Sequence, residues 1–252
     1  MALTEYDRRK MMNCVQTWKE NNNRLTVLLH SLSRLGVFIA GLALLTLIWG
    51  CAHGSYSVDM KYVPTKPMAE IKGPEKDIKI TVSTFEDLRK TDDKLQIGWV
   101  WDHYGGKTPV FPRFVKPSMA VTLPVKEIFQ KAGYQVAADT PLWNLKEDSI
   151  RKEWGPILVG GSIDELEVYC VDDIAVKKYR SKAKITVFLA NTQTRKIFYK
   201  VSANSTASLD HVLFSEGRLT QQINAVFSDV IGKIFEGNEI SSKILAEAAG
   251  KL

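Results

Sequence analysis

One stretch of uncharged residues, from Leu35 to Trp49, constrains this chain more than any other feature. Its fifteen residues, LGVFIAGLALLTLIW, are apolar except for two glycines and Thr46. As a helix it would be about 22 Å long, at about 1.5 Å per residue, whereas the hydrocarbon core of a bilayer is about 30 Å thick. The stretch therefore fits the apolar region of a signal peptide better than a spanning helix. Basic residues precede it and favour a cytoplasmic start, so we expect residues 1–50 to be a signal peptide.

The four residues that end this region, Ile48-Trp49-Gly50-Cys51, resemble the lipobox of bacterial lipoproteins. That pattern is an aliphatic residue, a variable one, a small one and then cysteine. The resemblance implies that the Cys51 thiol carries a diacylglyceryl group and that signal peptidase cuts between Gly50 and Cys51. Two or more acyl chains give stable attachment to a membrane. The alternative is an uncleaved anchor helix with an incidental cysteine.

Both interpretations place the rest of the chain outside the cytoplasm, attached to a membrane and facing the periplasm. Ala52 follows the cysteine where inner-membrane lipoproteins of enterobacteria usually have aspartate. By this resemblance we expect the outer membrane of the cell envelope as the destination.

The positive charge of the chain belongs partly to this leader. Of the net charge of +6, three charges lie before Cys51, where six basic and three acidic residues stand. No stripe of lysine and arginine with interleaved aromatics stands out, so we expect no nucleic-acid partner. After cleavage Cys170 would be the one remaining free thiol, which excludes an internal disulfide. The fold must then depend on its hydrophobic core.

Residues 51–76 are rich in proline, glycine, serine and lysine, which predicts a lipidated N-terminus followed by a flexible tether. We expect the globular domain to span residues 77–237. Residues 238–252 would form a tail or a short helix.

Within the domain, apolar residues alternate with polar ones in several segments, as in half-buried strands. Two other segments repeat apolar residues every three or four positions, as in amphipathic helices. We expect strands at 78–82, 95–101, 134–136, 156–171, 182–189 and 196–203, and helices at 118–132 and 215–236. This order predicts an α+β fold: a mostly antiparallel sheet with two main helices packed on one face, preceded by the signal or anchor helix and the tether.

These elements resemble the YajG-type family of uncharacterised bacterial lipoproteins. The resemblance covers most of residues 77–236 and rests on weakly specific motifs: Asp77-Ile-Lys-Ile-Thr-Val leading into Phe85-Glu-Asp87-Leu-Arg89, then Ile97-Gly98, then Ala132-Gly133-Tyr134-Gln-Val136, and a terminal amphipathic helix. It implies an α+β domain on a lipid anchor, without a settled activity and without known binding residues. The aromatic segment Trp99-Val-Trp101-Asp-His103-Tyr104 departs from the family pattern.

Residues that could carry catalysis are sparse. Asp102 and His103 are adjacent, and neighbouring residues of a strand point to opposite faces, so they cannot form a dyad with each other. The sequence has no Gly-x-Ser-x-Gly, no His-Glu-x-x-His and no paired cysteine spacing. We therefore expect no catalytic residues, no metal site, no cofactor and no enzymatic activity. Asp87 and Arg89 are expected to pair and fix a strand end, and Cys170 to be buried and inert.

Trp99, Trp101 and Tyr104 are the candidate binding residues, because aromatic side chains are favoured at interfaces. Packing in the core is the default interpretation of these aromatics, and a surface that faces a partner or the peptidoglycan is the alternative. The favoured hypothesis is a non-enzymatic lipoprotein that binds an envelope protein, as an accessory to a transport or assembly machine. One alternative is a structural tether that binds the cell wall through the aromatic loop. Another is a hydrolase with an active site around Asp87, Asp102 and His103.

Overall fold

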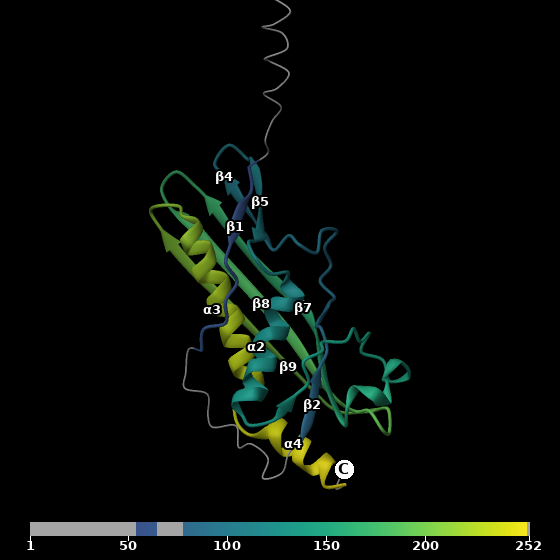
Figure 1. Cartoon of the computed structure of the whole chain (residues 1–252). Helices are drawn as coiled ribbons and strands as arrows, with labels where there is room; N and C mark the ends of the chain where they lie inside the picture. Colours follow the sequence, from purple (N-terminus) through teal and green to yellow (C-terminus); the bar gives the residue numbers. More distant parts are fainter. Residues whose placement is uncertain (1–53, 65–77, 251–252) are drawn as a thin grey trace, which may run out of the picture. The chain divides into compact units, whose positions relative to one another are not determined.

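Three long strands form the centre of the sheet: β7 (Ile157–Asp172), β8 (Lys177–Asn191) and β9 (Lys196–His211). The computed structural model describes residues 54–64 and 78–250. The three strands form an antiparallel meander that pairs along nearly its whole length (Figure 1). Along β8, Ala183, Ile185 and Val187 are buried, whereas Lys184, between Ala183 and Ile185, is exposed. This is the alternation expected from the sequence.

Six shorter strands complete the nine-stranded sheet. Three of them lie parallel to β7 along its free edge: β2 (Lys79–Val82), β3 (Glu86–Asp87) and β4 (Gly98–Asp102). The others extend the sheet outward: β5 (Lys107–Pro112) pairs antiparallel with β4, β1 (Tyr56–Val58) parallel with β5, and β6 (Gln135–Val136) parallel with β2.

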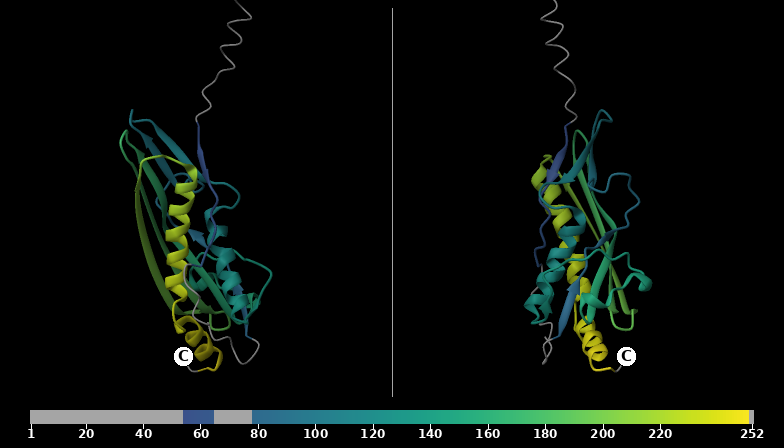
Figure 2. Two further views of the ribbon diagram at one scale, coloured as in Figure 1. Left: turned by 90° about the vertical axis from the view of Figure 1, so that its left-hand side faces the viewer. Right: turned by 45° about the vertical axis from the view of Figure 1, so that its right-hand side comes forward.

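Two helices, α2 (Pro117–Lys131) and α3 (Glu216–Phe235), pack on one face of this sheet (Figure 2). Pro117 stands at the first position of α2, where its missing N–H costs nothing. The Ser215 hydroxyl caps α3 by accepting a bond from the Arg218 N–H. A third helix, α4 (Glu239–Ala248), follows with Ile240 and Ile244 buried. The α+β class with a mostly antiparallel sheet is confirmed, and the C-terminal segment is a short helix rather than a tail.

The opposite face of the sheet is covered at one end by a second, smaller cluster of buried residues. Segment 137–156, with the 3₁₀ turns η1 (Glu147–Ser149) and η2 (Lys152–Trp154), packs there. The cluster consists of Trp143, Ile150, Leu158 and Ala190. Ile197 also packs against this cluster, whereas Tyr199 packs on the opposite face of the sheet. The cause is a register shift in the pairing of β8 with β9, which reverses the alternation between these two residues. The unbroken alternation predicted for a strand at 196–203 would put both residues on one face.

Residues 54–64 are part of the folded domain. β1 pairs with β5, and the Val58 side chain is fully buried. The N–H of Val63 donates to the Ser228 hydroxyl on α3 at 2.9 Å. The predicted flexible tether over residues 51–76 is therefore wrong over residues 54–64, and the domain begins well before Asp77. A three-residue strand with one buried side chain gives too little periodicity to be recognised in the sequence.

The chain divides into two units, Met1–His53 and Gly54–Leu252, and every described residue belongs to the second. The predicted signal peptide, Gly50 and Cys51 lie outside the described residues. So does the remainder of the predicted tether, 65–76. Among the described helices, none combines the length and apolar character needed to cross a bilayer.

Candidate functional site

Strand β4 places two tryptophans on the face of the sheet that the helices leave open. Gly98 and Val100 are buried against the core, so the alternation of the strand turns Trp99 and Trp101 to the opposite face, where both are half-buried. Tyr169 lies beside Trp99 on β7 and packs edge-on against Trp101, with 5.7 Å between ring centroids. We call these three rings, together with Lys107, the aromatic corner.

Lys107 covers the tryptophans of the aromatic corner from strand β5. Its ammonium lies 3.6 Å from the centroid of the Trp99 ring and 5.4 Å from that of Trp101. At these distances the cation is attracted to the negative face of each ring. The aromatic corner therefore presents a positive charge together with its apolar surface.

Tyr104, the third predicted aromatic residue, does not join the corner. It lies in the turn between β4 and β5, where its side chain is 87% exposed and its ring is 3.7 Å from that of His103. The structure thus brings together two of the three predicted residues. Sequence reasoning missed Tyr169 and Lys107 as members. The alternation of β7, which turns Tyr169 to the face opposite Cys170, is the signal that could have found the first of them.

A cleft of about 500 Å³ lies next to Trp99. It forms because β7 has no neighbouring strand along part of its edge. β3 ends at Asp87, opposite Ile163, and β4 begins at Gly98, opposite Val168. Charged side chains line the outer wall of this cleft: Asp164, Glu165, Glu167 and Lys182. We call it the binding cleft, after the role proposed for it below.

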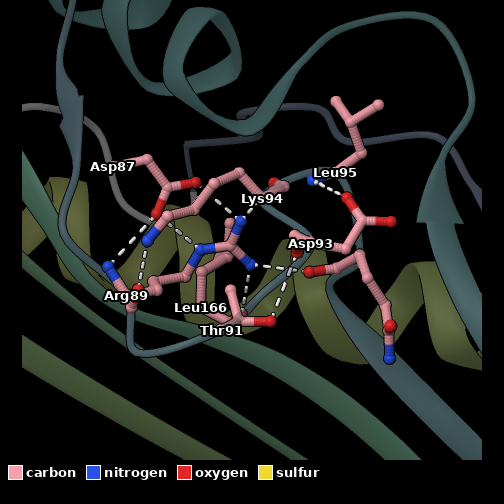
Figure 3. A network of polar contacts seen from close by, with 8 residues as sticks. Asp87, Arg89, Thr91, Asp93, Lys94, Leu95 and Leu166 are labelled. Atoms are coloured by element: carbon pink, nitrogen blue, oxygen red, sulfur yellow. Dashed lines mark hydrogen bonds and ion pairs between the residues drawn. The ribbon is translucent and has the colours of Figure 1, made fainter.

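The side chain of Arg89 closes the gap in the sheet at the base of the cleft (Figure 3). Its guanidinium donates two bonds to the Asp87 carboxylate, at 2.9 and 2.7 Å. Further bonds go to the backbone carbonyls of Gln96, Leu166 and Lys94. All five N–H donors of the guanidinium are thereby used, and Arg89 is only 6% exposed. The predicted pairing of Asp87 with Arg89 is confirmed, and Arg89 has no donor left for a ligand.

The polar groups on the outer wall face solvent and form a mixed charge pattern. Lys182 lies between Glu165 and Glu167, at 3.6 and 3.3 Å from their carboxylates. Burial disfavours the charged form of Lys182, but Glu167 and then Glu165 outweigh it and raise the pKa of the amine. Asp164, the extra residue of a bulge in β7, accepts bonds from the hydroxyls of Ser162 and Thr186. The cleft can bind polar and charged groups beside an aromatic surface.

The residues of the predicted hydrolase site do not converge. Asp87 pairs with Ile163 and Asp102 with Asp172, nine residues further along β7, which corresponds to about 30 Å at ~3.3 Å per residue. Asp87 is engaged by Arg89. Asp102 accepts bonds from two backbone N–H groups of its own turn. An active site made of Asp87, Asp102 and His103 is therefore excluded. Within residues 54–64 and 78–250, no three acidic, histidine or cysteine side chains are grouped as metal ligands.

Cys170 is buried in the core. Burial, with a smaller contribution from Asp172, raises the pKa of its thiol to about 11 from the ordinary 9.0. This agrees with the prediction of a buried cysteine, and it predicts that the thiol is unreactive in the folded protein because thiolate is the reacting species.

We expect iodoacetamide at pH 8 to alkylate Cys170 at least about 100-fold more slowly in the native protein than in denaturant, from the difference in thiolate fraction alone. Because the folded-state pKa is raised, only the unfolded chain ionises between pH 9.0 and about 11. The contribution of the thiol to stability is thus complete below pH 9 and declines toward pH 11. Urea midpoints at pH 8 and pH 10 would measure this decline, which Cys170→Ala should reduce. A native alkylation rate within tenfold of the denatured rate would refute the assignment.

Solved structures with some similarity to this chain come from several bacteria. A protein of the DUF330 family from Xanthomonas campestris is 10% identical, with 77% of this chain and 99% of that chain covered and a TM-score of 0.46. A putative neuraminyllactose-binding hemagglutinin homolog from Helicobacter pylori is 9% identical, with 72% and 96% covered and a TM-score of 0.43. A lipoprotein from Neisseria meningitidis is 13% identical, with 61% and 98% covered and a TM-score of 0.26.

No family model matches the chain, and no curated protein matches it either. The TM-scores of these three structures are all below 0.5, so the similarities carry no argument about function. Membership of the YajG-type family stays a prediction, and a functional assignment depends on the lipobox-like sequence and on the aromatic corner with its cleft.

Proposed function

We propose that this chain is a non-enzymatic lipoprotein of the cell envelope whose domain binds a partner protein through the aromatic corner and the binding cleft. The observation that carries the proposal is the position of Trp99 and Trp101. Both are half-buried on the open face of the sheet, and Trp99 lines a charged cleft. Tryptophan and tyrosine are enriched among residues that dominate binding energy at protein interfaces.

The attachment to the membrane is supported by the sequence around Cys51. The apolar region is too short to span a bilayer comfortably, and Gly50 meets the need for a small residue before the cysteine. Acyl chains on Cys51 would hold the domain on the periplasmic side of the envelope. Ala52 supports the outer membrane as its destination.

A protein partner is favoured over a cell-wall glycan by the charge arrangement of the site. A sugar that stacks on tryptophan needs a free ring face, whereas the Lys107 ammonium lies 3.6 Å from the centroid of Trp99. A protein can instead offer carboxylates to Lys107 and cationic side chains to Glu165 and Glu167. Such complementary charges give specificity and speed to protein association.

The anchor is tested by replacing Cys51 with serine in cells that are labelled with radioactive palmitate. The wild type is expected to carry the label and to run at the mass of the processed chain. Cys51→Ser is expected to lose all label and to remain unprocessed, because the oxygen nucleophile does not replace the thiol in acylation. Label that persists in the variant would show that Cys51 is not the lipidated residue.

The binding surface is tested by mild crosslinking in membranes, followed by quantitative mass spectrometry of the captured proteins. Trp99→Ala combined with Trp101→Ala is expected to reduce the captured partner by about tenfold or more, the loss typical of interface hot spots. Thr206→Ala, on the exposed side of β9, is the matched control and should change nothing. Circular dichroism would verify that both variants are folded.

Two outcomes of this experiment would overturn the proposed partner. A wild-type chain that is captured alone, as a monomer, would contradict a protein-binding role. Sedimentation of the wild type with purified sacculi, lost in the double tryptophan variant, would instead assign the surface to the cell wall.

A further inference from the structure

Four large apolar side chains are exposed at one end of the sheet, in three neighbouring turns. They are Tyr104 (87% exposed), Ile174 (79%), Leu213 (69%) and Val212 (65%). Single exposed apolar residues are common on protein surfaces, but several in adjacent loops indicate contact with another surface. We call these four residues the apical rim.

The strand register places the three turns side by side. Asp102, the last residue of β4, pairs with Asp172, the last residue of β7. Asp172 pairs with Lys177 at the start of β8, which in turn pairs with His211 at the end of β9. The turns that follow Asp102, Asp172 and His211 therefore leave the same end of the sheet (Figure 1).

The N-terminus of the described domain lies at this same end. β1 is parallel to β5, with Tyr56 opposite Val110. The residues before Tyr56 therefore lie toward Lys107, the first residue of β5. Lys107 follows directly after the turn that holds Tyr104. Cys51 precedes Gly54 by three residues. Three residues of extended chain reach at most about 11 Å. An acylated Cys51 thus keeps Gly54 within about 11 Å of the point where the acyl chains enter the bilayer.

Four carboxylates at this end have partners inside the domain, two of them cations and two of them backbone N–H groups. Asp172 pairs with Lys177 at 2.6 Å, and Asp210 pairs with Arg180 at 2.9 Å. The Asp102 carboxylate accepts the backbone N–H groups of Tyr104 and Gly106, and Asp173 accepts that of Ile174. Carboxylates held in this way oppose contact with a lipid headgroup layer less than unpaired ones would.

From these observations we infer that the apical rim inserts into the headgroup region of the same bilayer that holds the Cys51 acyl chains. The occupant of this apolar surface is thus a lipid membrane, and the inference rests on the anchor proposed above. The rim and the acyl chains together fix the orientation of the domain, with the three long strands rising from the membrane. The binding cleft, lined by residues 164–167 of β7, then stands roughly 15–25 Å above the rim at ~3.3 Å per residue. The aromatic corner lies lower, because Trp101 pairs with Val171, one residue before Asp172. A partner would therefore contact the domain from near the headgroup layer up to the height of the cleft.

The inference is tested with spin labels on the full chain, processed in cells and reconstituted into vesicles of phosphatidylcholine and phosphatidylglycerol. One label is attached to Ile174→Cys in the rim and another to Leu142→Cys, an equally exposed residue (82%) away from it. Leu142 lies far from the rim along the sheet. It pairs with Thr84, just before β3, and Glu86 of β3 pairs with Ser162. Ser162 precedes Asp172, at the rim end of β7, by ten residues. That separation is about 33 Å. Cys170 is buried and does not compete for the label.

We expect the ratio of oxygen to nickel-chelate accessibility to rise at least fivefold for the Ile174→Cys label when the protein enters vesicles, and to stay unchanged for the Leu142→Cys label. Mass spectrometry of the N-terminal peptide reports the acylation of Cys51 in the same sample. If Cys51 is acylated but both labels behave alike, the rim does not insert and only this inference fails. If Cys51 carries no acyl group, the proposed anchor fails, and the inference that depends on it fails too.

Discussion

Replacing Arg89 with alanine is expected to lower the free energy of unfolding by about 3–5 kcal/mol, the range for removing one partner of a buried ion pair. The variant would leave the Asp87 carboxylate, 13% exposed in its side chain, without its cation. It would also remove the donors that satisfy the carbonyls of Gln96, Leu166 and Lys94. The gap between β3 and β4 would then have no group to close it.

Urea denaturation followed by circular dichroism measures this effect. Lys90→Ala, at the exposed neighbouring residue, should change stability by less than about 0.5 kcal/mol. Arg89→Lys should fall between the two, because an ammonium keeps the charge but has three donors that lack the planar arrangement of the guanidinium. A loss below about 1 kcal/mol in Arg89→Ala would show that the network in Figure 3 does not support the sheet as described.

A single methyl group at Gly98 is expected to cost about 3 kcal/mol, at the upper end of the usual range for overpacking. A Cβ atom there would lie 1.6 Å from the carbonyl oxygen of Val168 and 2.7 Å from its carbonyl carbon. These are backbone atoms of the paired strand, so β4 would have to move away from β7. Because Trp99 and Trp101 stand on β4, the aromatic corner would be displaced as well.

Gly232→Ala on α3 is the matched control for this substitution. A Cβ at Gly232 meets no atom within 4 Å. Within a helix, alanine is favoured over glycine by roughly 0.5–1 kcal/mol, so this variant should be slightly more stable than the wild type. The same chemical change thus has opposite expected signs at two sites, and thermal or urea midpoints distinguish them. Equal effects at both positions would contradict the close approach of β4 to β7.

The two stability predictions concern the residues that position the binding surface. Arg89 seals the base of the binding cleft, and Gly98 allows β4 to lie against β7 with its tryptophans facing outward. Neither residue has a group available for a partner. Loss of binding in these variants would therefore follow from loss of structure, which separates them from Trp99 and Trp101.

The sequence by itself determined those parts of this protein that depend on long periodic patterns. The alternation in β7 to β9 and the three- and four-residue spacing of α3 extend over enough positions to be recognised, because one face of each element must be buried. The placement of Trp99 and Trp101 on one shared face follows from the same alternation, whereas their position on the open face is seen only in the structure. The pairing of Asp87 with Arg89 was also predictable, since both side chains lie on one short segment.

Only the tertiary structure decided which segments lie side by side. The binding cleft exists because two short strands pair with β7 at separate places, and no local pattern encodes the gap between Asp87 and Gly98. Tyr169 and Lys107 join the tryptophans from strands far away in sequence. Residues 54–64, which looked like a tether, are held by β5 and α3 rather than by their own periodicity. Lateral pairing and packing between distant segments depend on the whole chain, and a local sequence pattern cannot report them.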